Sequence, residues 1–133
     1  MTLETIIDNE HITLWYHPET KIVHHEIHKY IYGDTFRDAL MTGADLLKKH
    51  TACKWLSNDR SNAALLKEDT DWLTENFVPK AIEAGWQYWA IVAPKSVVGK
   101  MSIEGLRRFY TERGLDVMVF DDEKNAMDWL ISK

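Results

Sequence analysis

Hydrophobic positions in the first quarter of the chain fall into two short runs separated by a polar turn. Residues 12–16 combine β-branched and aromatic side chains, and a second extended run covers residues 21–31. The residues between them, 17–20, include Pro18, whose ring holds φ at a value suited to a turn. Two extended runs joined by so short a turn predict a β-hairpin.

The spacing of hydrophobic positions then changes from strand-like to helical. Four positions recur at the intervals of one helix face: Phe36, Leu40, Gly43 and Leu47. Thr35 and Asp38 have the spacing of a capping box, in which the first residue of a helix and the residue three positions later bond each other's backbone. We therefore expect a helix that begins near residue 34 or 35 and ends at residues 50–51.

Three further strands alternate with three further helices over the rest of the chain. The strands are expected at residues 52–57, 86–93 and 115–120. The first of these helices is expected to begin near Asp69, to bend at Pro79 and to end at Gly85. The second is expected to end at Gly114, and the third to open at residues 121–123. Alternating strands and helices predict a parallel sheet with helices packed against it.

Length and composition agree with this architecture. The chain has 133 residues, of which 45% are hydrophobic and 28% are charged, a balance typical of one globular domain. We therefore predict a single α/β domain over residues 1–133. It consists of an N-terminal β-hairpin followed by βα units, with a mostly parallel five-stranded sheet and four helices.

Charge and the absence of certain motifs exclude several classes of protein. A net charge of −5 argues against nucleic-acid binding and, without a basic patch, against stable membrane association. The acidic N-terminal residues do not resemble a signal peptide, and no apolar run has the length of a membrane span. The single cysteine, Cys53, cannot form an internal disulfide. We expect a cytoplasmic protein, and no motif indicates a cofactor or a metal.

Two segments resemble a known family. They are residues 54–60, Lys-Trp-Leu-Ser-Asn-Asp-Arg, and the stretch 79–92, which contains Pro-Lys-Ala-Ile followed by Ala-Gly-Trp-Gln-Tyr-Trp-Ala-Ile-Val. With the order of elements, they resemble the SpoIIAA-like fold shared by STAS domains and the lipid-binding domain of SEC14-type proteins, and in particular small bacterial proteins of this kind without an assigned activity. The resemblance covers roughly residues 10–132. It implies either a regulatory protein–protein interaction or the binding of an apolar ligand, because fold alone does not decide function.

The chain departs from the phosphorylated motif of anti-sigma-factor-antagonist STAS domains. These domains carry Asp-Ser-Ser/Thr-Gly between a strand and the next helix, and phosphorylation of the serine switches partner binding. The corresponding residues 57–62 read Ser-Asn-Asp-Arg-Ser-Asn, with no glycine after them. We therefore carry no phosphorylation site over to Ser61.

Polar residues follow the predicted parallel strands and form a candidate ligand site. Ser57, Asp59 and Arg60 lie at the carboxyl end of one strand, where ligands of α/β proteins usually bind. The loops after the next two strands add four more polar residues: Lys95, Ser96, Asp121 and Asp122. The planar guanidinium of Arg60 is suited to a carboxylate or a phosphate. The alternative is structural: Asp59 and Arg60 form a local ion pair, and the two aspartates cap a helix.

Histidines concentrate in the predicted hairpin, where five of the six lie between His11 and His28. His24 and His25 are expected to point to opposite faces of a strand. Only a cross-strand pair, of His11 or His17 with His24 or His28, brings two together. A metal site needs further ligands at fitting spacing, so half-exposed structural histidines are the alternative that we prefer.

The chain contains six tryptophans, a high number for its length. Trp86 and Trp89 differ by three positions and are therefore expected to point to opposite faces of one strand. Together with Trp72 they are candidates for an interface between subunits or for an apolar-ligand site. The alternative is an aromatic-rich core in which each indole N–H finds an acceptor.

Taken together, these patterns favour a non-enzymatic module for protein interaction or regulation, most simply as a homodimer. The second hypothesis is a carrier or sensor of a small apolar or amphipathic ligand. An enzyme with an anion site at Asp59 and Arg60 is the third. No catalytic residue is assigned, because the chain lacks a Gly-x-Ser-x-Gly elbow and Cys53 lies inside a predicted strand.

Overall fold

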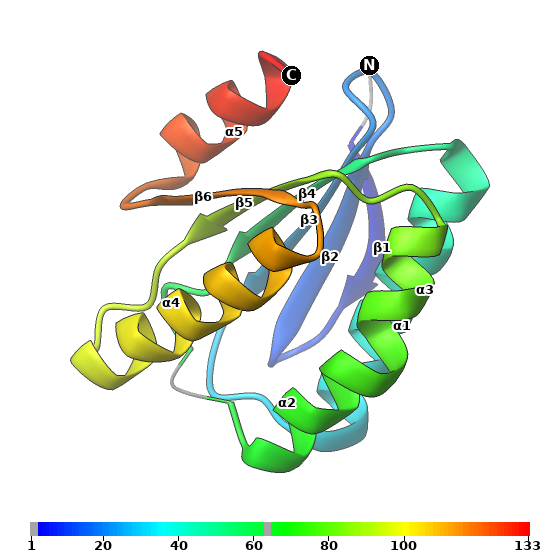
Figure 1. Cartoon of the computed structure of the whole chain (residues 1–133). Helices are drawn as coiled ribbons and strands as arrows, with labels where there is room; N and C mark the ends of the chain where they lie inside the picture. The colour runs from blue at the N-terminus through cyan, green and yellow to red at the C-terminus, as the bar shows by residue number, and fades with distance from the viewer. Residues whose placement is uncertain (1–2, 63–64) are drawn as a thin grey trace.

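The computed structural model describes residues 3–62 and 65–133 and contains a six-stranded sheet. In chain order the strands are β1 (Glu4–Asp8), β2 (Ile12–His17), β3 (Ile22–Ile27), β4 (Lys54–Asn58), β5 (Tyr88–Val92) and β6 (Asp116–Phe120). They lie side by side in this same order (Figure 1). The pairs β1–β2 and β2–β3 are antiparallel, whereas β3 to β6 run parallel. The sheet is therefore mixed.

The α/β class is confirmed, but the prediction of a mostly parallel five-stranded sheet is wrong. The strand that sequence patterning missed is β1, whose residues Glu4–Asp8 are mostly exposed. Its sequence Glu-Thr-Ile-Ile-Asp lacks the alternation of a half-buried strand, and pairing with β2 is what orders it. With β1 present, two of the five strand pairs are antiparallel.

Helical segments cover both faces of the sheet. They are α1 (Gly33–His50), α2 (Lys67–Trp72), the π-helical turn η1 (Leu73–Phe77), α3 (Val78–Glu83), α4 (Val97–Glu112) and α5 (Glu123–Ile131). Since α2, η1 and α3 follow one another without a break, they form one helical segment, and the four predicted helical regions are present. In Figure 1 the helices α1 to α4 lie on one side of the sheet, and α5 lies on the other.

The two faces of the sheet bury separate apolar clusters because side chains alternate along each strand. On β4, Trp55 belongs to the large cluster beneath α1 to α4, and Leu56 belongs to the small cluster beneath α5. The small cluster consists of Ile22, Leu56, Ala90, Val92, Ala126 and Leu130. The large cluster contains Trp55, Trp86 and Trp89 and borders the candidate site.

The helical segment 67–83 changes its hydrogen-bond pattern just before Pro79. Proline has no backbone N–H and cannot continue the regular ladder of an α-helix. The Val78 N–H donates to the carbonyl of Leu73, five residues earlier, which is the bond of a π-helix. This turn directs Leu73 and Phe77 into the core. The expected stop at Gly85 is seen, with φ at +111°.

The start of α1 is not held by a capping box, so that prediction is wrong. Thr35 lies within the first turn, and the N-cap residue, Tyr32, makes no side-chain bond to the helix. The Gly33 N–H instead donates to Asp69 Oδ2 at 3.1 Å. Arg37 Nε donates to the other oxygen of Asp69 at 3.0 Å. The start of α1 is therefore held by Asp69, which is distant in the sequence, and not by the local pair of Thr35 and Asp38.

Candidate functional site

A cavity lies between the sheet and the helices on its α1 to α4 face. Its volume is about 50 Å³, and it opens to solvent on one side. Residues of β3, β4 and β5 form its floor, and residues of α1, η1 and α4 form its walls. Six aromatic side chains are in the lining: Phe36, Trp55, Phe77, Trp86, Trp89 and Tyr110. The cavity is therefore mainly apolar and rich in aromatic side chains.

Strand register brings three polar side chains together at the floor of this cavity. His25 on β3 pairs with Ser57 on β4, and both side chains lie on the cavity side of the sheet. Asp59 follows directly after β4, and its backbone N–H donates to the carbonyl of Val92 at the end of β5. All three side chains are buried, with 5% of His25, 1% of Ser57 and 8% of Asp59 exposed.

Two chains of hydrogen bonds converge on the Asp59 carboxylate. Trp55 Nε1 donates to His25 Nδ1 at 3.0 Å, and His25 Nε2 lies 3.2 Å from Asp59 Oδ1. Trp89 Nε1 donates to Ser57 Oγ at 2.8 Å, and the Ser57 hydroxyl donates to Asp59 Oδ2 at 3.3 Å. Each chain begins at an indole N–H, which can only donate. Each therefore ends on the carboxylate as the final acceptor.

The direction of these bonds sets which His25 ring nitrogen accepts and which donates. Since Trp55 can only donate, His25 Nδ1 must be an acceptor and carries no proton. The proton of the neutral ring then sits on Nε2, which donates to Asp59. Among the described residues no lysine or arginine lines the cavity. The negative charge of Asp59 is therefore not balanced by a lysine or an arginine at the site.

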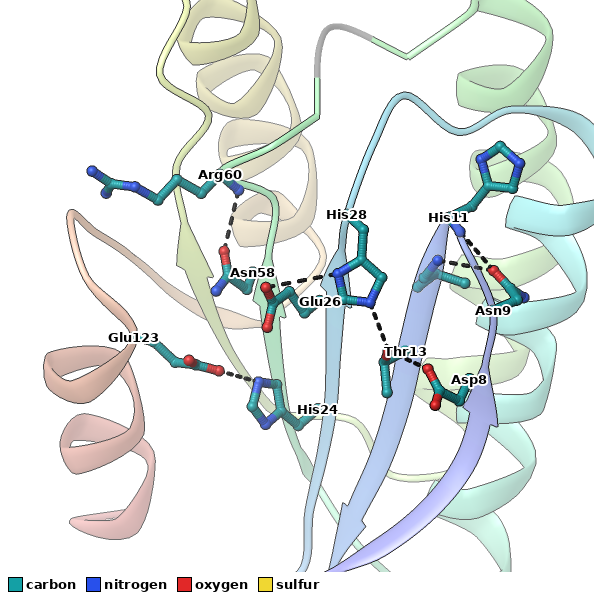
Figure 2. Close-up of polar contacts among 11 residues, drawn as sticks. Asp8, Asn9, His11, Thr13, His24, Glu26, His28, Asn58, Arg60 and Glu123 are labelled. Carbon is teal, nitrogen blue, oxygen red and sulfur yellow. Dashed lines mark hydrogen bonds and ion pairs between the residues drawn. The ribbon is translucent and has the colours of Figure 1, made fainter.

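The predicted ligand-site residues separate into those inside the cavity and those outside it. Ser57 and Asp59 lie inside, whereas the exposed Lys95 is not part of the lining. Ser96 accepts the N–H of Gly99 at 2.9 Å and thereby caps α4. Arg60 donates to the carbonyl of Asp121 and extends away from the sheet face (Figure 2), so the local ion pair with Asp59 is not formed.

The helix-capping interpretation holds for one of the two aspartates after β6. Asp122 Oδ1 accepts the N–H of Asn125 at 2.8 Å and caps α5. The carbonyl of Asp121 accepts the Arg60 guanidinium. Both residues are exposed, and neither is part of the cavity lining.

The tryptophans named as interface or ligand candidates are mostly buried. Trp86 and Trp89 are 4% and 7% exposed and belong to the cavity lining. The expectation that they point to opposite faces is wrong, because β5 begins at Tyr88 and Trp86 precedes the strand. Their ring centroids lie 5.4 Å apart. Trp72 is half-buried, with the Arg37 guanidinium 5.6 Å from its ring.

Sequence patterning did not single out His25, Tyr110 or Phe77 as site residues. Tyr110 was part of the apolar face of a helix, and His25 was one histidine among several. The only available signal was strand alternation, which separates His25 from His24. Burial raises the pKa of the Tyr110 phenol well above its usual range, so this cavity residue is neutral at physiological pH.

Comparison with known proteins does not identify a family for this chain. No protein-family model, curated protein or solved structure matches the chain. The likeness to SpoIIAA-like proteins therefore stays a prediction. Within residues 3–62 and 65–133, no helix has both the length and the apolar character needed to cross a membrane.

The opposite face of the sheet carries one of the cross-strand histidine pairs that the hairpin allows, His17 with His24. His17 Nε2 lies 3.0 Å from His24 Nδ1, and His24 Nε2 contacts Glu123 at the start of α5 (Figure 2 shows the latter contact). His28 Nε2 lies 2.6 Å from Thr13 Oγ1 on the same face. In the described part of the chain, no three His, Cys, Asp or Glu side chains are arranged to hold a metal ion.

The His17–His24–Glu123 contact is expected to make stability depend on pH. Burial, followed by the nearby His24, lowers the pKa of His17 below its ordinary value of 6.5. The hydrogen bond from His24 lowers the pKa of Glu123. Folded His17 thus resists a proton that the unfolded chain accepts, so acidification below about pH 6.5 favours unfolding. The contribution of Glu123 is lost only at lower pH, below its ordinary value of 4.5.

We predict that His17→Gln flattens this dependence, because glutamine can still donate to His24 but does not titrate. Melting temperatures of both proteins between about pH 7.5 and about pH 5.5 test it. The wild-type protein should lose more stability over this interval than the variant. Equal losses in the two proteins would contradict the prediction.

Proposed function

We propose that the protein binds a small, largely apolar ligand in the aromatic cavity and acts as a carrier or sensor of it. The observation that carries this proposal is a buried polar network that ends at unfilled space. Asp59 accepts from His25 and Ser57, and the remaining lone pairs of its carboxylate are available to a ligand. Pockets of this composition, apolar with a few converging polar groups, are typical of small-molecule sites.

The cost of this arrangement to the folded chain supports a role in binding. Protein interiors are close-packed, and unfilled space beside large side chains lowers stability. A buried carboxylate without a basic partner lowers it further. Asn62 Oδ1, which also lines the cavity, has no hydrogen-bond partner among the described residues. Departures from good packing and polar pairing are expected where function requires them.

Binding is favoured over catalysis by the directions of the hydrogen bonds. A serine nucleophile needs a base that removes its proton, usually a histidine. Ser57 instead donates to Asp59, and His25 uses both ring nitrogens for Asp59 and Trp55. The polar side chains therefore hold one another in place and leave the carboxylate as the group that meets a ligand.

A neutral aromatic probe tests the proposal. Benzyl alcohol should bind the wild-type protein, detected by saturation-transfer NMR and by a rise in melting temperature. Ser102 lines the cavity, and Lys100 on the same helix is exposed. Ser102→Phe should fill the space and weaken binding at least about ten-fold, whereas Lys100→Phe should leave it unchanged. Absence of binding, or equal binding by the two variants, would reject the cavity as a ligand site.

Association of two copies is supported by a separate feature. The first turns of α4 expose three apolar side chains on neighbouring positions, Val97, Val98 and Met101, which are 74%, 65% and 69% exposed. Apolar side chains gathered on a surface favour contact with a partner. Native mass spectrometry of the purified protein reports the homodimer expected from the sequence in the same spectrum as any retained ligand, and a monomer at high protein concentration would count against the dimer.

A further inference from the structure

We infer that the cavity selects a cation: an organic ammonium carried on an apolar body. The inference rests on the proposed function, since it names the ligand class of the same cavity. Its basis is the combination of an unbalanced buried carboxylate, hydrogen-bond acceptors without donors, and an aromatic lining.

The charge argument begins with Asp59. Because His25 Nδ1 accepts the Trp55 N–H, His25 meets the carboxylate as a neutral donor through Nε2. Arg60, the neighbouring basic residue, is bound to the carbonyl of Asp121. The described residues thus leave a buried negative charge supported only by neutral donors. A charge of this kind is costly to bury unless an opposite charge joins it.

The hydrogen-bond acceptor atoms at the site favour a ligand that carries hydrogen-bond donors. The carboxylate of Asp59 has about four lone-pair sites, and His25 and Ser57 occupy two of them. Asn62 Oδ1 is a further acceptor without a partner among the described residues. An ammonium group can donate several N–H bonds and forms stronger bonds to a carboxylate than a neutral donor does. A carboxylate or phosphate would instead meet Asp59 as a like charge, which removes the basis for an anion site at Asp59 and Arg60.

The aromatic lining suits the same ligand. Aromatic ring faces carry partial negative charge and attract cations, most strongly in sites shielded from water. Trp55, Trp86 and Trp89 pack around the floor of the cavity, and Tyr110 contacts both Trp86 and Trp89. Tryptophan is the strongest of these cation partners. An apolar body next to the ammonium group would bury against the same rings.

The test uses three probes of nearly equal size and different charge: benzylammonium, benzyl alcohol and benzoate. Calorimetric titration of the wild-type protein should give a dissociation constant for benzylammonium at least about ten-fold below that for benzyl alcohol. Benzoate should bind more weakly than either. If benzyl alcohol binds as tightly as benzylammonium, or if benzoate binds best, the cation inference is overturned while the cavity remains a ligand site. If none of the three binds, the proposed function fails as well.

A variant that removes the charge of Asp59 tests whether this residue causes the preference for a cation. Asp59→Asn keeps an oxygen for His25 and an amide N–H for Ser57, so the network can persist without the charge. The preference for benzylammonium over benzyl alcohol should fall at least about ten-fold, because the ammonium loses its charged partner. Asp121→Asn is the matched control, because it removes one exposed negative charge outside the cavity and should leave the preference intact. Should Asp59→Asn keep the wild-type preference, the inference is wrong. The three-probe titration of the wild-type protein decides the question even where the variant does not fold.

Discussion

Gly43→Ala should destabilise the fold by about 3 kcal/mol, although alanine is the better helix former. Gly43 lies inside α1, where its backbone rests directly on the Trp55 ring. A Cβ at this position would stand 2.1 Å from Trp55 Cη2 and 2.8 Å from two further ring carbons. The ring cannot easily yield, because its N–H is bonded to His25 and it packs on Phe77 and Trp86. Urea unfolding followed by circular dichroism measures the loss.

Gly105→Ala is the matched control for this change. Gly105 also lies within a helix, α4, but a Cβ there meets nothing within 4 Å. This substitution should raise the free energy of unfolding by about 0.5–1 kcal/mol, since it limits the unfolded chain and improves helix propensity. If both variants were stabilised, the close contact of Gly43 with Trp55 would not exist in solution. A destabilised Gly43→Ala that still binds benzyl alcohol normally would separate the packing of Trp55 from the binding site.

Asp69→Ala is the second change with a large expected effect, again about 3 kcal/mol. Only 1% of Asp69 is exposed, and its two oxygens accept from the Gly33 N–H and from Arg37. Removing the carboxylate leaves a backbone donor and a guanidinium without their partner, and it frees the start of α1 from α2. The same urea unfolding experiment measures this loss.

Asp71→Ala provides the comparison within the same helix. Asp71 forms an exposed ion pair with Lys67 at 2.7 Å, and exposed pairs of this kind contribute little to stability. Its loss should therefore be small. Losses of similar size in the two variants would mean that Asp69 does not anchor α1.

Local patterns were sufficient for most helices and strands. The hairpin at β2 and β3, the end of α1 at His50 and the capping of α5 by Asp122 all depend on residues close together in the chain. The cross-strand pair of His17 and His24 also followed from the hairpin, because alternation and a short turn leave few ways to pair the two strands. The strand β1 was not predicted, because its mostly exposed residues lack the alternating hydrophobic pattern of a half-buried strand.

The candidate site was only half predictable. The candidate site predicted at the end of β4 includes Ser57 and Asp59, both of which line the cavity. Arg60, one residue further on, turns to the carbonyl of Asp121 instead. No short-range signal distinguishes these neighbours. The two side chains diverge at the end of β4. There the backbone N–H of Asp59 donates to the Val92 carbonyl of β5, and the Asp59 side chain lines the cavity.

Local stretches of the sequence specify the alternation of strands and helices from β2 onward and the turns between them, because these depend on neighbours within a few residues. Which distant residues meet depends on the packing of the whole chain. Parallel pairing of β3, β4 and β5 aligns His25 with Ser57 and Trp55 with Trp89. That register results from packing the helices on the sheet as a whole. It turns two indoles, a histidine and a serine into donors that converge on one buried carboxylate, an arrangement that no single stretch of the chain contains.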